Sequence, residues 1–211
     1  MTFKKTFLII TFLALVLLSA CSAKSIYEQS DIDINDVLVK VNSDYILKSD
    51  IDPIYEQYKG TTVTYKKIVE DSILEMLVVQ SSSKYDTQIS EKELDSILAD
   101  FENSQPDMFK EAADENGIEK LRQKLKIRNT YSKTKEYVMD NILLKDKTIS
   151  HDVIEQFKKE NNLVEQLAPY SDEEIIQNLK KELEEFMFRE WMLQLRDKAD
   201  IEYLQDIPKS E

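Results

Sequence analysis

Glycine is nearly absent from this sequence: Gly60 and Gly117 are the only two among 211 residues, and there are four prolines. Glycine supplies the tight turns of β-rich folds and the loops that hold phosphates in nucleotide sites. Two isolated glycines cannot build such loops, so the sequence argues against a β-rich fold and against a nucleotide-binding enzyme. Abundant Glu, Lys, Leu and Ile favour helices joined by short connections.

Histidine and cysteine occur once each, as His151 and Cys21. They leave no zinc site of the usual kind, no disulfide, and little room for a Ser-His-Asp or Cys-His arrangement. Carboxylate pairs must occur by chance among 41 acidic residues, and nothing marks one pair as catalytic. We therefore expect no catalytic residue, no metal, no cofactor and no small-molecule substrate.

Basic residues are in the minority, because 28 Lys and Arg stand against 41 Asp and Glu and the net charge is −13. Binding of phosphate backbones needs clustered Lys and Arg. The sequence thus argues against a nucleic-acid partner. It also disfavours flat adhesion of the protein surface to anionic lipid headgroups.

Residues 1–20 have the pattern of a signal peptide. Lys4 and Lys5 precede an apolar run, residues 7–18, that is broken only by Thr11. Twelve helical residues span about 18 Å, whereas a bilayer core needs about 20 residues, so this run is too short to cross a membrane. Removing residues 1–20 would change the net charge from −13 to −15, because the segment carries two lysines and no acid.

The four residues Leu18-Ser19-Ala20-Cys21 resemble a lipobox. The resemblance implies that the Cys21 thiol receives a diacylglyceryl group and that cleavage leaves Cys21 as the new N-terminus. Cys21 is then the lipidation site, and this lipid attaches the protein to the cell membrane on its extracytoplasmic side. The alternative is an ordinary secretory signal with an A-x-A cleavage site, which Ser19-Ala20-Cys21 matches imperfectly.

Residues 21–36 are polar and mostly acidic, and we interpret them as a tether. The spacing Asp31-x-Asp33-x-Asn35 resembles the start of a calcium-binding loop. The sixth position is Asp36 where that loop needs glycine, and the twelfth is Asn42 where it needs a bidentate glutamate. The sequence therefore predicts no calcium site in the tether.

Two β-prone runs, residues 37–41 and 45–47, flank the turn-forming Asn42-Ser43-Asp44 and predict a small hairpin. A third such run covers residues 201–204. Because a lone strand is not stable by itself, we expect it to pair with the hairpin, so that the two ends of the mature chain meet. Residues 206–211 remain as a tail.

Apolar residues at helical spacing predict helices between the hairpin and the last strand. Ser49 or Asp50 caps the first of them, with Pro53 in its first turn. Residues 65–82 are the best candidate for a central core helix. The sequence therefore predicts a mostly α fold with a small β element.

Capping signals place the remaining helices. Ser90-x-x-Glu93 and Ser171-x-x-Glu174 are capping boxes, and the second opens the longest helix, to about Ala199. Pro106 opens a short helix that Gly117 ends. A longer helix follows, with Leu121, Leu125, Tyr131 and Val138 on its inner side, and another starts at Ser150.

The order of these elements resembles the N-terminal domain of SurA- and PrsA-type extracytoplasmic chaperones. The pattern V-x-V-N-x-x-x-I runs from Val39 to Ile46, and Ser49-Asp50 follow it. Trp191-x-x-x-Leu195 and Ala199-Asp200-Ile201 are similar to the family's closing helix and strand. Residues 148–161 resemble the helix that precedes the family's parvulin domain. The resemblance covers about residues 37–205 and departs from the family at Ser43, where many members have glycine.

A parvulin prolyl-isomerase domain would be expected between Asn162 and Ser171, where this chain has only residues 163–170. Parvulin sites use paired histidines and glycine-rich turns, whereas this chain has one histidine and no glycine after Gly117. The resemblance therefore implies a chaperone that lacks the catalytic domain and is not an enzyme.

Three apolar residues around Pro106 are candidates for binding client proteins: Phe101, Met108 and Phe109. They stand in an otherwise acidic stretch, and flexible methionine and aromatic side chains suit promiscuous apolar binding. Burial inside the domain is the alternative. For His151, at the start of a predicted helix, we expect a place on the surface.

The apolar residues Phe186, Met187 and Trp191 recur at helical spacing, and we expect them in the core; a client-binding stripe is the alternative. The sequence and the resemblance together predict a membrane-anchored chaperone that holds unfolded or nascent secreted proteins without ATP. An interaction lipoprotein with one dedicated partner on the same scaffold is the alternative, and a peptidyl-prolyl isomerase with some other site is a third reading.

Overall fold

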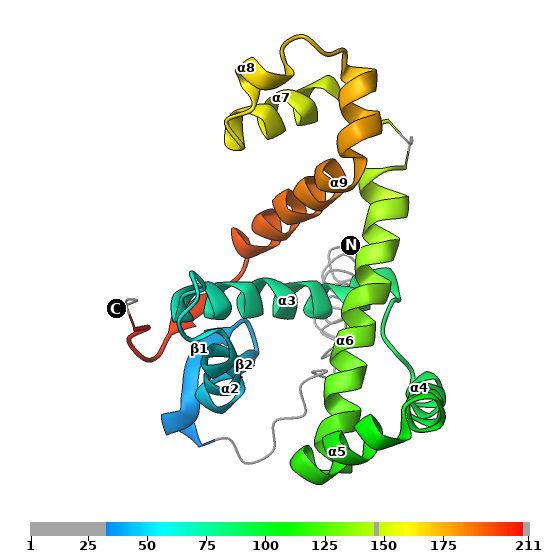
Figure 1. The fold of residues 1–211 in the computed structure, drawn as a ribbon. Helices are drawn as coiled ribbons and strands as arrows, with labels where there is room; N and C mark the ends of the chain where they lie inside the picture. The colour runs from blue at the N-terminus through cyan, green and yellow to red at the C-terminus, as the bar shows by residue number, and fades with distance from the viewer. Residues whose placement is uncertain (1–32, 146–147, 209–211) are drawn as a thin grey trace, which may run out of the picture.

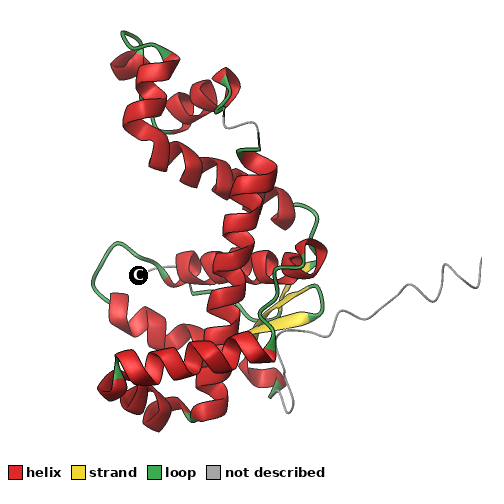
Figure 2. Ribbon diagram, turned by 90° about the vertical axis from the view of Figure 1, so that its right-hand side faces the viewer, coloured by secondary structure: helices red, strands yellow, loops and turns green. Residues whose placement is uncertain are grey.

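The chain folds into helices that extend from one small sheet. The computed structural model describes residues 33–145 and 148–208. Helices make up most of these residues, and three short strands form an antiparallel sheet beside them (Figures 1 and 2). The predicted mostly α fold with a small β element is confirmed.

The sheet joins the two ends of the described chain. Strands β1 (Val37–Val41) and β2 (Asp44–Leu47) form the predicted hairpin, and β3 (Ile201–Tyr203) pairs antiparallel with the other edge of β1. Val41 therefore lies opposite Asp44 on one side and opposite Ile201 on the other. The expected meeting of the two ends is confirmed.

Helix α3 (Tyr65–Tyr85) is the central helix that the sequence predicts. The Thr64 hydroxyl caps it by accepting the backbone N–H of Lys67 at 3.1 Å. The helix contacts the hairpin, α2, α6 and α9, so its apolar residues are buried on more than one face (Figure 1). Those contacts explain why its apolar stripe is so broad.

Helix α2 (Lys48–Tyr58) begins before both predicted capping residues, so that Ser49 and Asp50 lie inside its first turn and neither caps it. The Ser49 hydroxyl and backbone N–H both donate to the Asp36 carboxylate, at 2.5 and 3.1 Å, so Ser49 is bound to the preceding segment instead. Pro53 is consequently the sixth residue of the helix and not in its first turn. These two predictions were wrong because Ser49 binds Asp36, which lies 13 positions earlier in the chain, and so does not cap the helix.

Asn42 fastens the sheet to α3. It has a φ of 56°, the left-handed conformation that asparagine tolerates in tight turns. Its side chain donates to Gln80 Oε1 at 2.7 Å and accepts the backbone N–H of Asp200 at 3.0 Å. Gln80 in turn donates to the Val41 carbonyl at 3.0 Å and to the buried Asp44 carboxylate at 2.6 Å. One network thus holds the hairpin turn, the core helix and the start of β3.

Helices α4 (Glu91–Ser104), α5 (Pro106–Asn116) and α6 (Ile118–Val138) follow the predicted capping signals, and α4 and α5 form an arm against α6. The capping box at Ser90 is present, and Gly117 ends α5 with a φ of 75°. Four ion pairs tie this arm to α6 along its exposed edge: Arg122–Glu91, Arg122–Asp95, Lys126–Glu91 and Lys133–Glu93, at 2.6–3.1 Å. Exposed pairs such as these contribute little each, so apolar contacts must hold the arm.

The last helices form a second arm. Helix α7 (His151–Glu160) is capped by Ser150, and α9 (Asp172–Arg196) begins at the predicted Ser171 capping box. A short helix, α8 (Val164–Leu167), lies between them. α7, α8 and the first part of α9 lie together at the end of the molecule away from the sheet (Figure 1).

Four apolar clusters fill the interior. One lies between the sheet, α2 and α3; the second joins α3, α6 and α9 around Trp191; the third joins α7 and α9 around Leu183; and the fourth joins α4 and α6 around Leu94. All members lie between Leu38 and Ile207. A chain that starts at Ser22 therefore keeps every residue of these cores.

Ser82, on α3, should tolerate alanine with a gain in stability. Its side chain is fully buried, and its hydroxyl has no hydrogen-bond partner among the described residues. Alanine removes an unsatisfied buried group and raises helix propensity, so we expect Ser82→Ala to stabilise the fold by about 1 kcal/mol. For a domain of this size the melting temperature should rise by about 2–4 °C.

The matched control for this substitution is its neighbour Ser81. The Ser81 hydroxyl donates to the Val78 carbonyl at 2.7 Å, so Ser81→Ala gains nothing comparable. Thermal melts of both variants, followed by circular dichroism, make the comparison. A drop in melting temperature for Ser82→Ala would contradict the prediction.

Candidate functional site

The three predicted client-binding residues have different surroundings at the α4–α5 arm. Phe101 and Phe109 are half-buried, and their rings meet edge to face with centroids 5.5 Å apart. Phe109 also rests on the cluster around Leu94. Met108 is 57% exposed. Two of the three side chains therefore help to hold the arm together, and Met108 is the one of the three that is exposed.

Trp191 is buried in the cluster that joins α3, α6 and α9, as expected for a core residue. Phe186 and Met187 are half-buried and rest on the cluster between α7 and α9. The Phe186 ring meets Phe157 edge to face at 5.7 Å. Together the three residues serve packing between helices.

His151 lies on the surface, as expected, but it is not without a partner. Its Nδ1 lies 2.7 Å from the Asp172 carboxylate at the start of α9. The hydrogen bond and the charge of Asp172 raise the pKa of His151 above its usual value of 6.5. The pair connects the first residues of α7 and α9, the two helices of the second arm.

The His151–Asp172 pair predicts a pH dependence with a definite sign. Because the folded-state pKa of His151 is raised, the contact stabilises the fold below about pH 6.5 and is lost as the pH rises through the raised pKa. NMR titration can follow the single imidazole of the chain directly. We expect a pKa above 6.5 in the wild type and a return toward 6.5 in Asp172→Asn. Equal values in the two proteins would contradict the pairing.

Cys21, the predicted lipidation site, lies outside the described residues. Within residues 33–145 and 148–208, no helix is both long enough and apolar enough to span a bilayer. The same part of the chain contains no group of three or more His, Cys, Asp or Glu side chains that could hold a metal ion.

Helices α6 and α9 both depart from regular α-helical geometry where they meet. α6 ends in a π-helical turn, η2 (Met139–Leu143), which contacts α9. α9 is broken at Leu179, whose φ of −119° and ψ of 21° are not helical. π-helical turns are rare and occur often at functional sites. The coincidence of two irregularities marks this place as the candidate site.

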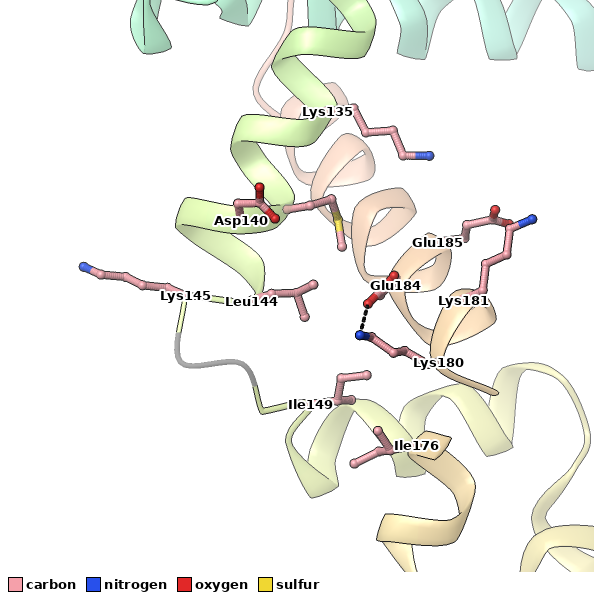
Figure 3. A pocket seen from close by; sticks show the side chains of 11 residues that line it. Lys135, Asp140, Leu144, Lys145, Ile149, Ile176, Lys180, Lys181, Glu184 and Glu185 are labelled. Atoms are coloured by element: carbon pink, nitrogen blue, oxygen red, sulfur yellow. Dashed lines mark ion pairs between the residues drawn. The ribbon is translucent and has the colours of Figure 1, made fainter. Parts of the chain in front are cut away.

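An open groove of about 880 Å³ lies between η2, the segment after it, and α9 (Figure 3). Its apolar lining comes from η2, from residues between η2 and α7, and from α9 before the break: Met139, Leu144, Ile149 and Ile176. The side chains of Leu144, Ile149 and Ile176 point into the hollow from three segments (Figure 3). The volume falls in the range of roughly 300–1,000 Å³ that is usual for binding sites.

Charged side chains surround this apolar lining. Four lysines and three acids contribute: Lys135, Lys145, Lys180, Lys181, Asp140, Glu184 and Glu185. Lys180 pairs with Glu184 at 3.7 Å, and the Lys135 ammonium lies 5.2 Å from the centre of the Phe188 ring. The lining thus carries a formal charge of +1, in a chain whose net charge is −13.

The sequence did not predict this groove. Its apolar members belong to different predicted elements, and neither the π-helical turn nor the break at Leu179 has a local sequence signal such as proline or glycine. Among the described residues with a positive φ, the one nearest in the chain to η2 and Leu179 is Asn162, whose φ is 56°. Leu144, Ile149 and Ile176 come together in one lining only once α7 has folded onto α9.

No protein-family model matches the sequence, and no curated protein matches it. The likeness to SurA- and PrsA-type chaperones therefore depends on the residues of this chain alone.

Proposed function

We propose that this protein is a membrane-anchored extracytoplasmic chaperone, which holds apolar segments of unfolded or nascent secreted proteins without ATP. The signal-like N-terminus with Cys21 supports export and lipid attachment. The order of the elements, from the hairpin to the closing strand, supports the chaperone part. In this proposal the protein catalyses no reaction and needs no cofactor beyond the lipid.

The observation that carries the proposal is the joining of the chain ends in one sheet, with two helical arms extending from the centre. The two arms expose a few large apolar side chains, Met108, Ile118, Val164 and Tyr170, and such open surface would suit clients of many lengths and sequences. Burial of client side chains would supply about 25 cal/mol for each Å² removed from water. A net charge of −15 on the mature chain would help to keep a loaded complex soluble.

Light scattering tests the proposal directly. Residues 22–211, which keep all core residues, are mixed at several-fold excess with three unrelated enzymes that aggregate on heating. We expect slower aggregation of all three, and no effect of an equal mass of an inert acidic protein. Failure to protect any of them would overturn the proposal.

The groove between η2 and α9 also gives some support to a dedicated interaction lipoprotein. A hollow with fixed charges is more selective than a flat apolar surface, because an unmatched charge opposes the wrong ligand. Protection of a single test protein among several would favour this second function. A proline-peptide assay completes the comparison: we expect the buffer rate, and clear acceleration would favour an isomerase.

A further inference from the structure

We infer that residues 24–31 of the tether dock on one side of α6, with Lys24 against Glu75 of α3. The docking goes beyond the proposed chaperone function, and its consequence at the membrane depends on the proposed lipid on Cys21. Three observations carry the inference: the side of α6 that faces α2, the place where the described chain begins, and the order of side chains in the tether.

One side of α6 carries Lys120, Lys124, Ile127 and Tyr131, which are three or four residues apart and therefore follow one another along the helix. The two lysines are exposed, and Ile127 is half-buried and belongs to none of the four apolar clusters. α2 and the first half of α6 lie on the same side of α3 (Figure 1). The charges of both lysines act on Asp50 of α2, so this side of α6, the docking face, is turned toward α2.

Helix α3 lies at the far end of the docking face, where the charges of its Glu75 and Asp71 act on Tyr131. The Glu75 side chain is exposed, yet desolvation by the surrounding protein raises the pKa of its carboxyl, as expected in a recess. Asp71 pairs with Lys67, whereas Glu75 has no hydrogen-bond or ion-pair partner among the described residues. The recess therefore favours a ligand that brings a cation to Glu75.

The described chain begins near the other end of the docking face. Asp36 accepts hydrogen bonds from Ser49 in the first turn of α2, and its charge acts on Asp50. Asp33, the first described residue, lies three positions earlier in the chain. Residues before Asp33 therefore join the domain close to the place where α2 faces the two lysines of α6.

The tether has complementary side chains in the matching order. Read backward from Asp33, it carries the acids Asp31 and Glu28, then the apolar pair Tyr27 and Ile26, and then Lys24, its only base. The docking face presents two lysines, then two side chains with apolar surface, and then the unpaired acid of α3. Each group of the tether would thus meet a group of opposite charge or of the same apolar character.

The lengths of the two partners agree as well. Lys120 and Tyr131 are eleven residues apart on a helix, which corresponds to about 16 Å. Seven residue steps separate Asp31 from Lys24, and an extended chain of that length spans at most about 25 Å. The segment is therefore long enough to follow the docking face and to bring Lys24 to Glu75.

Docking would shorten the connection to the membrane. Only three residue steps separate Lys24 from the proposed lipid on Cys21, and they span at most about 10 Å. The docked domain is then held against the bilayer. A client that covered Ile127 and Tyr131 would displace the segment and lengthen the tether, a step that depends on the proposed chaperone function.

Disulfide trapping in residues 22–211 tests the docking, because this chain has no cysteine of its own. Ser25→Cys is combined with Ile127→Cys on the docking face, or with Ile118→Cys as the matched control. Ile118 lies nine residues before Ile127, on the opposite side of α6, and is 46% exposed, so its thiol is at least as accessible. Oxidised glutathione starts the reaction, and peptide mass spectrometry measures the disulfide. We expect it to form several-fold faster with position 127, and equal rates would overturn the inference.

A charge swap in the trapping protein assigns Lys24 to Glu75. Lys24→Glu and Glu75→Lys should each slow the disulfide with position 127 by about two- to five-fold, the usual effect of an exposed ion pair, and the two together should restore the rate. The control is Glu115→Lys, which reverses an exposed acid on α5 and should leave the rate unchanged. A double variant as slow as the single ones would overturn the inference.

The outcomes separate from those of the aggregation assay, because trapping needs neither lipid nor client. Protection of the test enzymes with equal trapping at positions 127 and 118 would overturn the docking and leave the chaperone proposal standing. Fast trapping at position 127 without protection of any enzyme would overturn the chaperone proposal and leave the docking. A disulfide that joins two molecules would assign the docking face to a second copy of the chain and overturn the inference.

Discussion

Replacing Trp191 with alanine is expected to lower the free energy of unfolding by about 3–5 kcal/mol. Trp191 is only 8% exposed and stands in the cluster that joins α3, α6 and α9, with Val78 and Val138 contributed by the other two helices. Its ring stacks on Phe188 with centroids 5.4 Å apart and lies 6.4 Å from Tyr85. Alanine would leave a cavity among all three helices at once, which the remaining side chains cannot close.

The loss should be large relative to the whole stability of a domain, which is about 5–15 kcal/mol. For this size of protein the melting temperature should fall by roughly 6–20 °C. Urea denaturation followed by circular dichroism measures the change, because the variant lacks the only tryptophan of the chain. In the wild type, tryptophan fluorescence should report the same midpoint as circular dichroism.

Two controls define the effect of Trp191. Trp191→Phe keeps most of the apolar volume and should cost clearly less than alanine. Tyr170→Ala removes an aromatic ring that is 51% exposed, and should change stability by less than about 0.5 kcal/mol. A loss below 1 kcal/mol for Trp191→Ala would contradict the conclusion that Trp191 packs the three helices against one another.

Local signals explain why most elements could be predicted from the sequence. The capping boxes at Ser90 and Ser171 satisfy backbone N–H groups within one turn, and Gly117 adopts the positive φ that ends α5. Such features depend on a few neighbouring residues. The start of α2 was predicted wrongly because the competing acceptor, Asp36, lies 13 positions before Ser49.

The pairing of β3 with the hairpin shows that one long-range feature could also be predicted. Residues 201–203 form too short a strand to stand alone, and the hairpin was the available partner. The network through Asn42 and Gln80, which fixes this arrangement, carried no recognisable pattern. It depends on side chains 38 positions apart that meet only in the folded chain.

The candidate site was harder to predict than the fold. The sequence pointed to Phe101, Met108 and Phe109, and two of these are engaged with each other or with the arm. Hydrophobic periodicity locates an apolar residue on a face but does not say whether another helix covers it. The groove arises from a π-helical turn and a helix break that tertiary contacts determine, so neither could be read from periodicity.

Replacing Cys21 with alanine is expected to remove lipid labelling of the protein completely. The proposed thioether and N-acyl groups need the sulfur and the new α-amino group of this one residue, and the chain has no other cysteine. Two or more acyl chains hold a protein on a membrane stably, because each buried CH₂ contributes about 0.8 kcal/mol and a single chain gives only marginal binding. We therefore expect lipid labelling in the wild type and no lipid labelling in the variant.

The folded domain should stay close to the membrane in the wild type. Twelve residue steps separate Cys21 from Asp33, and a fully extended chain of that length spans at most about 40 Å. From Asp33 onward the segment is fixed to the sheet, because Gln205 donates to the carbonyls of Asn35 and Val37 at 2.6 and 3.0 Å. The lipid would thus place the sheet nearest the bilayer and leave the two helical arms free for clients.

Metabolic labelling with palmitate measures this prediction in cells that express either the full chain or the variant. The wild type should carry the label and enter the detergent phase on phase separation, whereas Cys21→Ala should show no label. Ser22→Ala, which changes the next residue and leaves the sulfur in place, should keep the label. A labelled Cys21→Ala protein would contradict the lipobox, because no other residue of the chain could carry a thioether-linked diacylglyceryl group.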